Sequence, residues 1–251
     1  MIETKQLTKH YGDTTVLNHV DLVIPQGGVT SIIGANGAGK STLLTAIARL
    51  IEADEGTALV GGLDVYHTNT RDLAKVLAVL RQDNHTLSRI RVRELVAFGR
   101  FPHSQGRLTA ECEEAIDHAI DVMELGAIKE KFIDELSGGQ RQRAFVAMVL
   151  AQDTEYILLD EPLNNLDMKH SVSMMRTISA AAKNEGKTVV LVIHDINMAA
   201  AFSDHLVAMK NGTIFTTGSP AEVMTSDVLS DLYEFPIDVE MIHDRPTAIY
   251  Y

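Results

Sequence analysis

The stretch GANGAGKST, residues 34–42, decides the fold of this chain, and it directly follows the apolar run VTSII. Its spacing fits GxxxxGK[ST], in which glycines let the backbone curl with its amides pointing at a phosphate group. The following run STLLTAIARL has the apolar periodicity of a helix, whose positive dipole end would face the same anion. A strand, a phosphate loop and a helix therefore predict a nucleoside triphosphate site in an α/β protein.

Each part of this loop has an expected role in holding the triphosphate. Lys40 supplies a compact cation for the β- and γ-phosphates, and the hydroxyl of Ser41 is placed to ligate a magnesium ion. A glycine-rich loop formed by chance is the alternative, but the strand before it and the helix after it supply the required context. The residues expected to contact the nucleotide are Gly34, Asn36, Gly37, Ala38, Gly39, Lys40, Ser41 and Thr42.

The composition fits an ordinary globular protein of the cytosol. The chain has 251 residues, 45% of them apolar, and its longest apolar runs fall far short of a bilayer span. The N-terminus shows no signal-peptide pattern. One cysteine, Cys112, leaves no internal disulfide, and the histidine spacing gives no support for a structural zinc site. A net charge of −12 argues against nucleic acid as a partner.

Apolar runs that alternate with helical patterns predict a mainly parallel sheet covered by helices. The expected core strands are VTSII, VLAVL, YILLD and TVVLVI. Residues 1–28 read as an antiparallel β layer, and Asn211 with Gly212 marks a hairpin turn. A helical subdomain is expected over about residues 89–150. The last stretch, 238–251, suggests an edge strand or a hairpin, because Pro246 disfavours a central position.

The segment YILLDE, residues 156–161, is an apolar strand that ends in two adjacent carboxylates. Adjacent strand residues point to opposite faces, so the two acids have different expected roles. Asp160 is placed to hold magnesium, and Glu161 to polarise a water that attacks the γ-phosphate. Two solvated acids at a strand end are the alternative, which the phosphate loop upstream disfavours.

The segment LSGGQ, residues 136–140, precedes a helical run and is a second candidate phosphate-binding surface. Ser137 and Gln140 have the spacing of a capping box, which is the purely structural interpretation. A cap alone does not need Gly138 and Gly139. These glycines leave a bare helix N-terminus that can lie against an anion.

Together the three motifs resemble those of an ATP-binding-cassette ATPase, whose signature is LSGGQ, over nearly the whole chain. The resemblance implies one cassette domain over residues 1–251. It also implies a P-loop core with a mainly parallel sheet, an N-terminal antiparallel layer and an inserted helical subdomain. ATP and Mg²⁺ are the implied cofactors, and ATP hydrolysis is the implied activity.

Further site residues follow from the same resemblance. Tyr11 resembles the aromatic residue that stacks on adenine; a strand aromatic in a small core is the alternative. Gln82 resembles the glutamine that senses magnesium and the attacking water, and is expected to serve both catalysis and metal binding. His194 resembles the switch histidine on the γ-phosphate. Asp167 resembles the aspartate of the loop that crosses the subunit boundary.

The resemblance also implies partners, because one phosphate loop and one signature make an incomplete site. A head-to-tail homodimer would hold two ATP molecules at its interface. Transport would need separate integral-membrane permease subunits, which we expect to dock on residues 82–100, and indirectly a substrate-binding protein. The chain would then lie peripherally on the inner face of the cell membrane.

The cargo expectation rests on two longer segments. VAFGRFPHSQGRLT, residues 96–109, is similar to a segment in importers of ferric siderophores, haem and vitamin B12. AQDTEYILLDEPLNNLDMKHS, residues 151–171, is similar to ATPases of siderophore uptake, including petrobactin-type systems. We therefore expect iron-siderophore import, with haem or vitamin B12 as alternatives. An efflux ATPase, a non-transport cassette protein of translation or DNA repair, and a small-molecule P-loop kinase are the remaining rivals.

Overall fold

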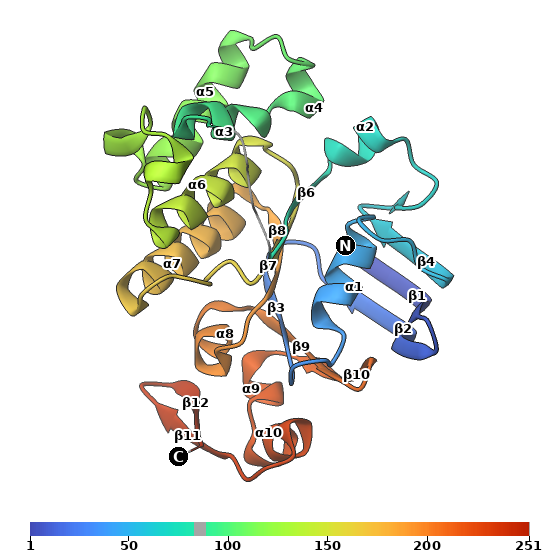
Figure 1. Ribbon diagram of the computed structural model, residues 1–251. Coiled ribbons are helices and arrows are strands. Elements are labelled where there is room, and N and C mark those ends of the chain that lie inside the picture. Colours follow the sequence, from blue (N-terminus) through green and yellow to red (C-terminus); the bar gives the residue numbers. More distant parts are fainter. Residues whose placement is uncertain (83–88, 251) are drawn as a thin grey trace.

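A six-stranded sheet runs through the centre of the molecule in the computed structural model, which describes residues 1–82 and 89–250 (Figure 1). Its order is β10-β9-β3-β8-β7-β6, with parallel pairing from β9 through to β6. The four apolar runs predicted as core strands are confirmed as β3, β6, β7 and β8. The six strands are β3 (Gly28–Ile33), β6 (Leu77–Leu80), β7 (Tyr156–Asp160), β8 (Thr188–Val192), β9 (His205–Lys210) and β10 (Thr213–Gly218).

These central strands are continuous apolar runs because helices or a second sheet cover both of their faces. Every residue of β7 and β8 is buried, as expected for parallel strands inside an α/β protein. The antiparallel strand β10 is added at one edge by a tight turn at Asn211 and Gly212, both with positive φ. The α/β class and the predicted hairpin are confirmed.

The N-terminal part of the chain forms a separate antiparallel sheet of order β2-β1-β4-β5, which confirms the predicted layer (Figure 1). Inward-facing apolar residues of β2, such as Leu17, Val20 and Leu22, alternate with exposed ones. The strands are β1 (Ile2–Tyr11), β2 (Thr14–Ile24), β4 (Glu55–Val60) and β5 (Leu63–Asp64).

Helix α1 (Lys40–Ile47) lies between the two sheets (Figure 1). Its residues Leu43, Leu44 and Ile47 share one hydrophobic core with Leu17 of β2 and Val190 of β8. This packing fixes the start of the helix, and with it the phosphate loop, against both layers. A short helix, α2 (Thr70–Ala74), precedes β6.

A block of helices covers the other side of the central sheet (Figure 1). Apolar faces of α3, α5 and α6 pack together, with Leu95, Ile116 and Val146 in the same core. The elements are α3 (Val92–Phe98), α4 (Phe101–Ser104), α5 (Ala110–Val122), two 3₁₀ turns (Gly126–Ile128 and Ile133–Glu135), α6 (Gly138–Ala151) and α7 (Met168–Glu185). In the part of the chain that the structure describes, no helix combines the length and hydropathy needed to cross a membrane.

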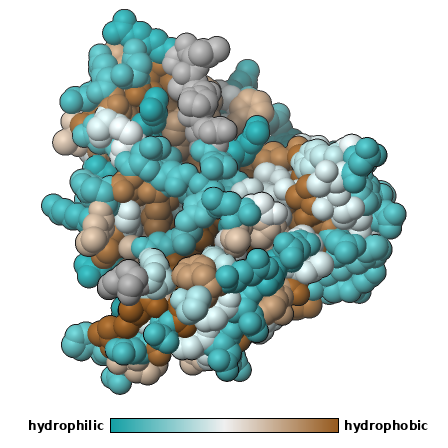
Figure 2. All heavy atoms as spheres, turned by 60° about the horizontal axis from the view of Figure 1, so that its bottom comes forward, coloured by the Kyte–Doolittle hydropathy of each residue, from teal (hydrophilic) through white to brown (hydrophobic). Residues whose placement is uncertain are grey.

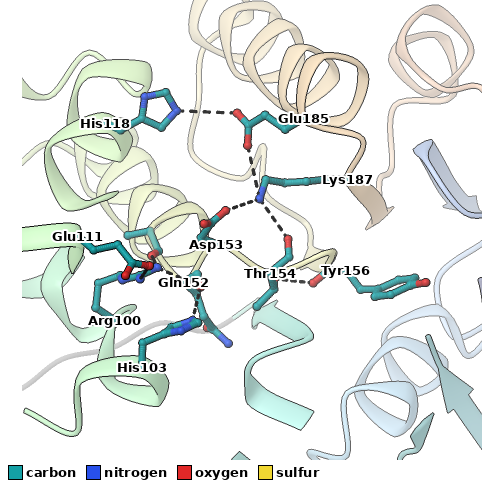
Figure 3. Close-up of polar contacts among 11 residues, drawn as sticks. Arg100, His103, Glu111, His118, Gln152, Asp153, Thr154, Tyr156, Glu185 and Lys187 are labelled. Atoms are coloured by element: carbon teal, nitrogen blue, oxygen red, sulfur yellow. Dashed lines mark hydrogen bonds and ion pairs between the residues drawn. The ribbon is translucent and has the colours of Figure 1, made fainter. Parts of the chain in front are cut away.

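A polar network ties this helical block to the central sheet just after α6 (Figure 3). The carbonyl of Gln152 accepts from Nε2 of His103 at 2.9 Å, and Arg100 donates to the neighbouring carbonyl of Ala151 at 3.0 Å. The buried Lys187 pairs with Asp153 at 2.7 Å, directly before β8. The amide of Gln152 also donates to two carbonyls ahead of and within β6. The residues at and just after the C-terminal end of α6 are therefore fixed to the amino ends of two strands, β6 and β8.

The C-terminal part packs beside the carboxyl ends of the central strands. It forms a hairpin, one of the two forms expected, in which Pro246 pairs with Met241. Asn197 of α8 fastens this hairpin by two hydrogen bonds with the backbone of Ala248, at 3.1 and 2.7 Å. The elements are α8 (Ile196–Phe202), α9 (Pro220–Val223), α10 (Ser226–Tyr233), β11 (Asp238–Ile242) and β12 (Arg245–Ile249).

Candidate functional site

The phosphate loop joins the carboxyl end of β3 to the start of α1. Gly34 has φ of 143°, and a Cβ there would lie 2.2 Å from the carbonyl oxygen of Met209, so no other residue fits. The ammonium of the buried Lys40 donates to the carbonyls of Gly34 and Ala35 at 2.8 and 2.9 Å. Burial lowers the pKa of Lys40, and the nearby Glu161 and Asp160 oppose this shift. The loop thus holds a largely desolvated cation at its mouth.

The hydroxyl of Ser41 and the carboxylate of Asp160 lie together beneath the loop. Ser41 Oγ donates to Asp160 Oδ1 at 2.8 Å. Asp160 is buried at the end of β7, and burial raises the pKa of its carboxyl, while the bond from Ser41 opposes that shift. Hydroxyl and carboxylate oxygens are hard ligands of the kind that Mg²⁺ prefers. This pair therefore fits a magnesium ion.

Three hydrogen bonds converge on the carboxylate of Glu161. His194 Nε2 lies 2.6 Å from Oε1, and Gln82 Nε2 donates to Oε2 at 2.8 Å. Asn164, which sequence reasoning missed, donates to Oε2 at 2.5 Å. Glu161 has φ of 50°, an unfavourable conformation for a non-glycine residue. Gln82, Glu161 and His194 follow neighbouring strands whose carboxyl ends share one edge, which explains why they meet.

A cavity of about 370 Å³ opens over the loop and these side chains. Val16 of β2 forms part of its wall, so the antiparallel sheet contributes to the site. No sequence signal marked this residue, because its position depends on how the two sheets pack. The lining residues are Val16, Asn36, Gly37, Gly39, Lys40, Ser41, Thr42, Gln82, Glu161 and His194.

Tyr11 and Ala38 lie outside the lining of this cavity. Tyr11 ends β1 with 52% of its surface exposed, so it does not belong to a small core as the alternative interpretation required. Its ring has Lys9 Nζ at 5.7 Å. Ala38 is buried under the loop. The adenine role of Tyr11 stays a prediction.

The signature segment lines a second cavity, of about 310 Å³. Its predicted capping box is present: Ser137 Oγ accepts from the amide of Gln140 at 3.3 Å, and Gln140 Oε1 accepts from the amide of Ser137 at 3.2 Å. A Cβ on Gly139 would lie 3.0 Å from Leu166, so the glycine also permits close packing of the next loop. The lining residues are Ser137, Gly138, Gly139, Gln140, Arg143, Asn165, Asp167 and His170.

Asp167 holds the rim of this second cavity in place by capping α7. Its carboxylate accepts from the amide of His170 at 2.8 Å and contacts the His170 ring at the same distance. Both hydrogen bonds lower the pKa of the Asp167 carboxyl, and the bond from the His170 backbone amide has the larger effect. The two cavities share no lining residue among those described. One chain therefore presents two separate cavities, one at the phosphate loop and one at the signature.

An apolar groove lies on the helical block; it includes part of the predicted docking surface, residues 82–100, and extends beyond it to Leu108. Phe98 and Phe101 line it and are 56% and 63% exposed. Arg89 and Glu94 add charges at its sides. Residues 83–88 of the docking prediction lie outside the described residues. Two exposed phenylalanines close together favour a surface that another protein covers.

Known proteins similar to this chain share one family. The family model described as ABC transporter matches residues 17–164. The petrobactin import ATP-binding protein FatE of Bacillus anthracis is 50% identical over 250 residues, with 100% of both chains covered. The iron(3+)-hydroxamate import ATP-binding protein FhuC of Bacillus subtilis (strain 168) is 40% identical, covering 98% of this chain and 91% of that protein.

Solved structures agree with this similarity. An ATP-binding cassette dimer in a post-hydrolysis state with ADP and Pi has a TM-score of 0.79 at 28% identity. It covers 88% of this chain and 99% of that chain. The protein cbiO1 from Clostridium perfringens, part of the ABC transporter complex cbiONQ, has a TM-score of 0.79 at 27% identity, with 92% of each chain covered.

Proposed function

Because the chain belongs to the ABC transporter family, we propose that it is the ATPase subunit that powers import of an iron-siderophore complex through separate permease subunits. The resemblance inferred from its three motifs is correct. The assignment of a siderophore as the transported substrate rests on the full-length 50% identity to a petrobactin import ATP-binding protein. The whole chain acts as one cassette, with residues of about 89–150 as its helical subdomain.

In this proposal, hydrolysis takes place over the phosphate loop. The loop amides and Lys40 compensate the charge of the γ-phosphate. Glu161 orients the attacking water and accepts its proton, and His194 contacts the γ-phosphate. The convergence of Gln82 and His194 on the Glu161 carboxylate supports these roles, because it holds that group in one orientation.

Magnesium is the metal that we assign to this site. Ser41 and Asp160 would hold it, with Gln82 beside them, and Asp160 would act through water. When bound, the ion neutralises charge on the β- and γ-phosphates. The 2.8 Å bond between Ser41 and Asp160 supports the assignment, since it brings two oxygen ligands to one point.

A homodimer completes each ATP site. The signature residues Ser137, Gly138, Gly139 and Gln140 would face the nucleotide of the second copy, with Asp167 at the boundary. Two observations support this arrangement: the signature lines its own cavity, away from the phosphate loop, and a similar cassette has been solved as a dimer. ATP would then hold two copies together, and hydrolysis would release them.

We assign the apolar groove on the helical block to the permease. A cytoplasmic segment of a membrane subunit would cover Phe98 and Phe101 and so place this chain peripherally on the inner face of the membrane. A substrate-binding protein would deliver the siderophore to the permease. The nucleotide sites of this chain would not contact the cargo.

Uptake by reconstituted vesicles tests the proposal. The chain is purified with the membrane subunits that accompany it and reconstituted with ATP inside, and labelled ferric petrobactin, haem and cobalamin are supplied with their binding proteins. We expect ATP-dependent uptake of ferric petrobactin. Uptake of haem or cobalamin alone would replace the cargo assignment. Active ATP hydrolysis without uptake of any of the three would contradict the importer assignment.

A further inference from the structure

A small aromatic groove lies directly beside His194. It measures about 210 Å³. Most of its wall comes from the C-terminal elements. The lining residues are His194, Ile196, Tyr233, Phe235, Ile237 and Tyr250. Since His194 lines both this groove and the nucleotide cavity, the two hollows share a wall.

The groove is firmly built. Tyr233 is half-buried; burial raises the pKa of its hydroxyl to about 12, and the nearby backbone of Gly34 opposes this shift. The rings of Tyr233 and Phe235 lie 6.4 Å apart at 60°. Ser230 Oγ accepts from the amide of Ile237 at 2.9 Å. The groove is therefore connected both to the phosphate loop and to the catalytic histidine.

A second feature, an exposed methionine, lies beside the signature cavity. Met168 is 82% exposed, more than any other exposed large hydrophobic residue described. It is the first residue of α7 and follows Asp167, which lines the signature cavity. The Asp167 cap fixes the backbone beside it. An apolar side chain is thus held out into solvent at the edge of a polar surface.

We propose that Met168 of one copy inserts into the aromatic groove of the second copy. This contact rests on the proposed head-to-tail dimer, in which the signature and Asp167 face the partner's nucleotide. Met168 adjoins that surface in sequence and the groove adjoins the same nucleotide site through His194, so the contact continues the ATP-dependent interface. A flexible thioether among aromatic rings is a favourable pairing.

The twofold symmetry of the dimer makes this contact twice. Each insertion would cover the outer side of His194 as ATP closes the interface. The chain also supplies a matched control: Met241 of β11 is 67% exposed but does not line the groove. Figure 2 brings the C-terminal end forward and shows hydrophobic residues gathered there among hydrophilic ones.

Dimerisation measured by light scattering tests the contact. All proteins carry Glu161→Gln, so that ATP is not consumed. Met168→Ala and Phe235→Ala should each weaken ATP-dependent dimerisation about tenfold. Together they should weaken it little more than either alone, because they remove the same contact. Met241→Ala and the conservative Met168→Leu should stay within about twofold of the parent. Thermal unfolding of each monomer checks that folding is intact.

Crosslinking gives an independent readout. Cysteines are introduced by Met168→Cys and Phe235→Cys in a Cys112→Ala background, and peptide mapping identifies which residues a short bismaleimide joins. With ATP, we expect a link between positions 168 and 235 of different copies. The pair Met168→Cys and Met241→Cys should give none.

The possible failures are distinguishable. If the parent protein forms no dimer with ATP, alone or with its membrane subunits, the proposed function fails. If it dimerises, but Met168→Ala dimerises as tightly and no 168–235 link forms, only the Met168 contact is wrong. A loss of dimerisation with Phe235→Ala but not Met168→Ala would also overturn the contact, because the groove would then bind something other than Met168.

Discussion

The phosphate loop and the signature segment differ in how firmly their side chains are held within one chain. At the phosphate loop, Lys40 and Asp160 are buried and already bonded to neighbouring groups. At the signature, Ser137 caps its helix, Asp167 caps α7 and contacts the His170 ring, and both residues line an open cavity. The first surface is preorganised within one chain, whereas the second, in the proposed dimer, would be completed by the nucleotide of the second copy.

This difference has an energetic side. Burial lowers the pKa of Lys40 and raises that of Asp160, so both charged forms are disfavoured before nucleotide binds. Phosphate and metal would pair these charges. At the signature, hydrogen bonds instead lower the pKa of the exposed Asp167. Burial therefore disfavours the charged forms at the loop, whereas hydrogen bonds favour the charged form of Asp167 at the signature.

The largest effect is expected on ATP hydrolysis at the phosphate loop, without an effect on ATP binding. Glu161→Gln should lower turnover about 1,000-fold, because an amide cannot accept the proton of the attacking water. ATP binding and the ATP-dependent dimer should persist. Steady-state hydrolysis and light scattering measure the two effects. Glu240→Gln, on the exposed strand β11, is the control. Hydrolysis at the rate of the unsubstituted protein would reject Glu161 as the base.

A smaller effect is expected at the signature. Ser137→Ala should lower hydrolysis about 100-fold by removing a donor to the partner's nucleotide, while ATP binding by the isolated chain stays unchanged. The substitution also removes a helix cap, which costs about 1 kcal/mol of stability. Thr225→Ala removes a comparable cap from α10 and serves as the control. Equal losses of activity in both variants would show that Ser137 acts only as a cap.

Tyr11 tests whether the antiparallel sheet takes part in the site. If it stacks on adenine, Tyr11→Ala should raise KM for ATP about threefold to tenfold with little change in kcat. Tyr11→Phe should leave both unchanged, because the ring remains. The comparison of ATP with inorganic triphosphate supplies the control, since triphosphate has no base to stack. An equal KM change for both substrates would contradict stacking.

The smallest effect concerns stability without nucleotide. Burial raises the folded-state pKa of Asp160 above 3.8, so ionisation costs stability as pH rises through the interval between the two values. The cost is larger at neutral than at acidic pH, and Asp160→Asn should remove it. We expect Tm at pH 7 to rise by about 2–4 °C, as for ~1 kcal/mol in a chain of this size. Thermal unfolding should show the gain shrinking towards acidic pH; a larger gain there would contradict the assignment.

Sequence reasoning succeeded where the signal is local. The phosphate loop, the four core strands and the capping box of Ser137 each lie within a short segment. It missed Val16 and Asn164, because β2 reaches the cavity only through sheet packing and Asn164 through a turn after β7. The groove beside His194 was also missed, since no pattern in the sequence relates Phe235 to that strand end.

The anchoring of α6 has a mechanical consequence. Gln152 pins this helix at its C-terminal end, while the signature occupies its N-terminal end. With 14 residues the helix is about 20 Å long, so a tilt of about 10° displaces the signature by roughly 3–4 Å. A tilt about the anchored C-terminal end would therefore move the N-terminal end of the helix most. In the proposed transporter, a push from a membrane subunit on the neighbouring helices would swing LSGGQ towards, or away from, the ATP of the second copy.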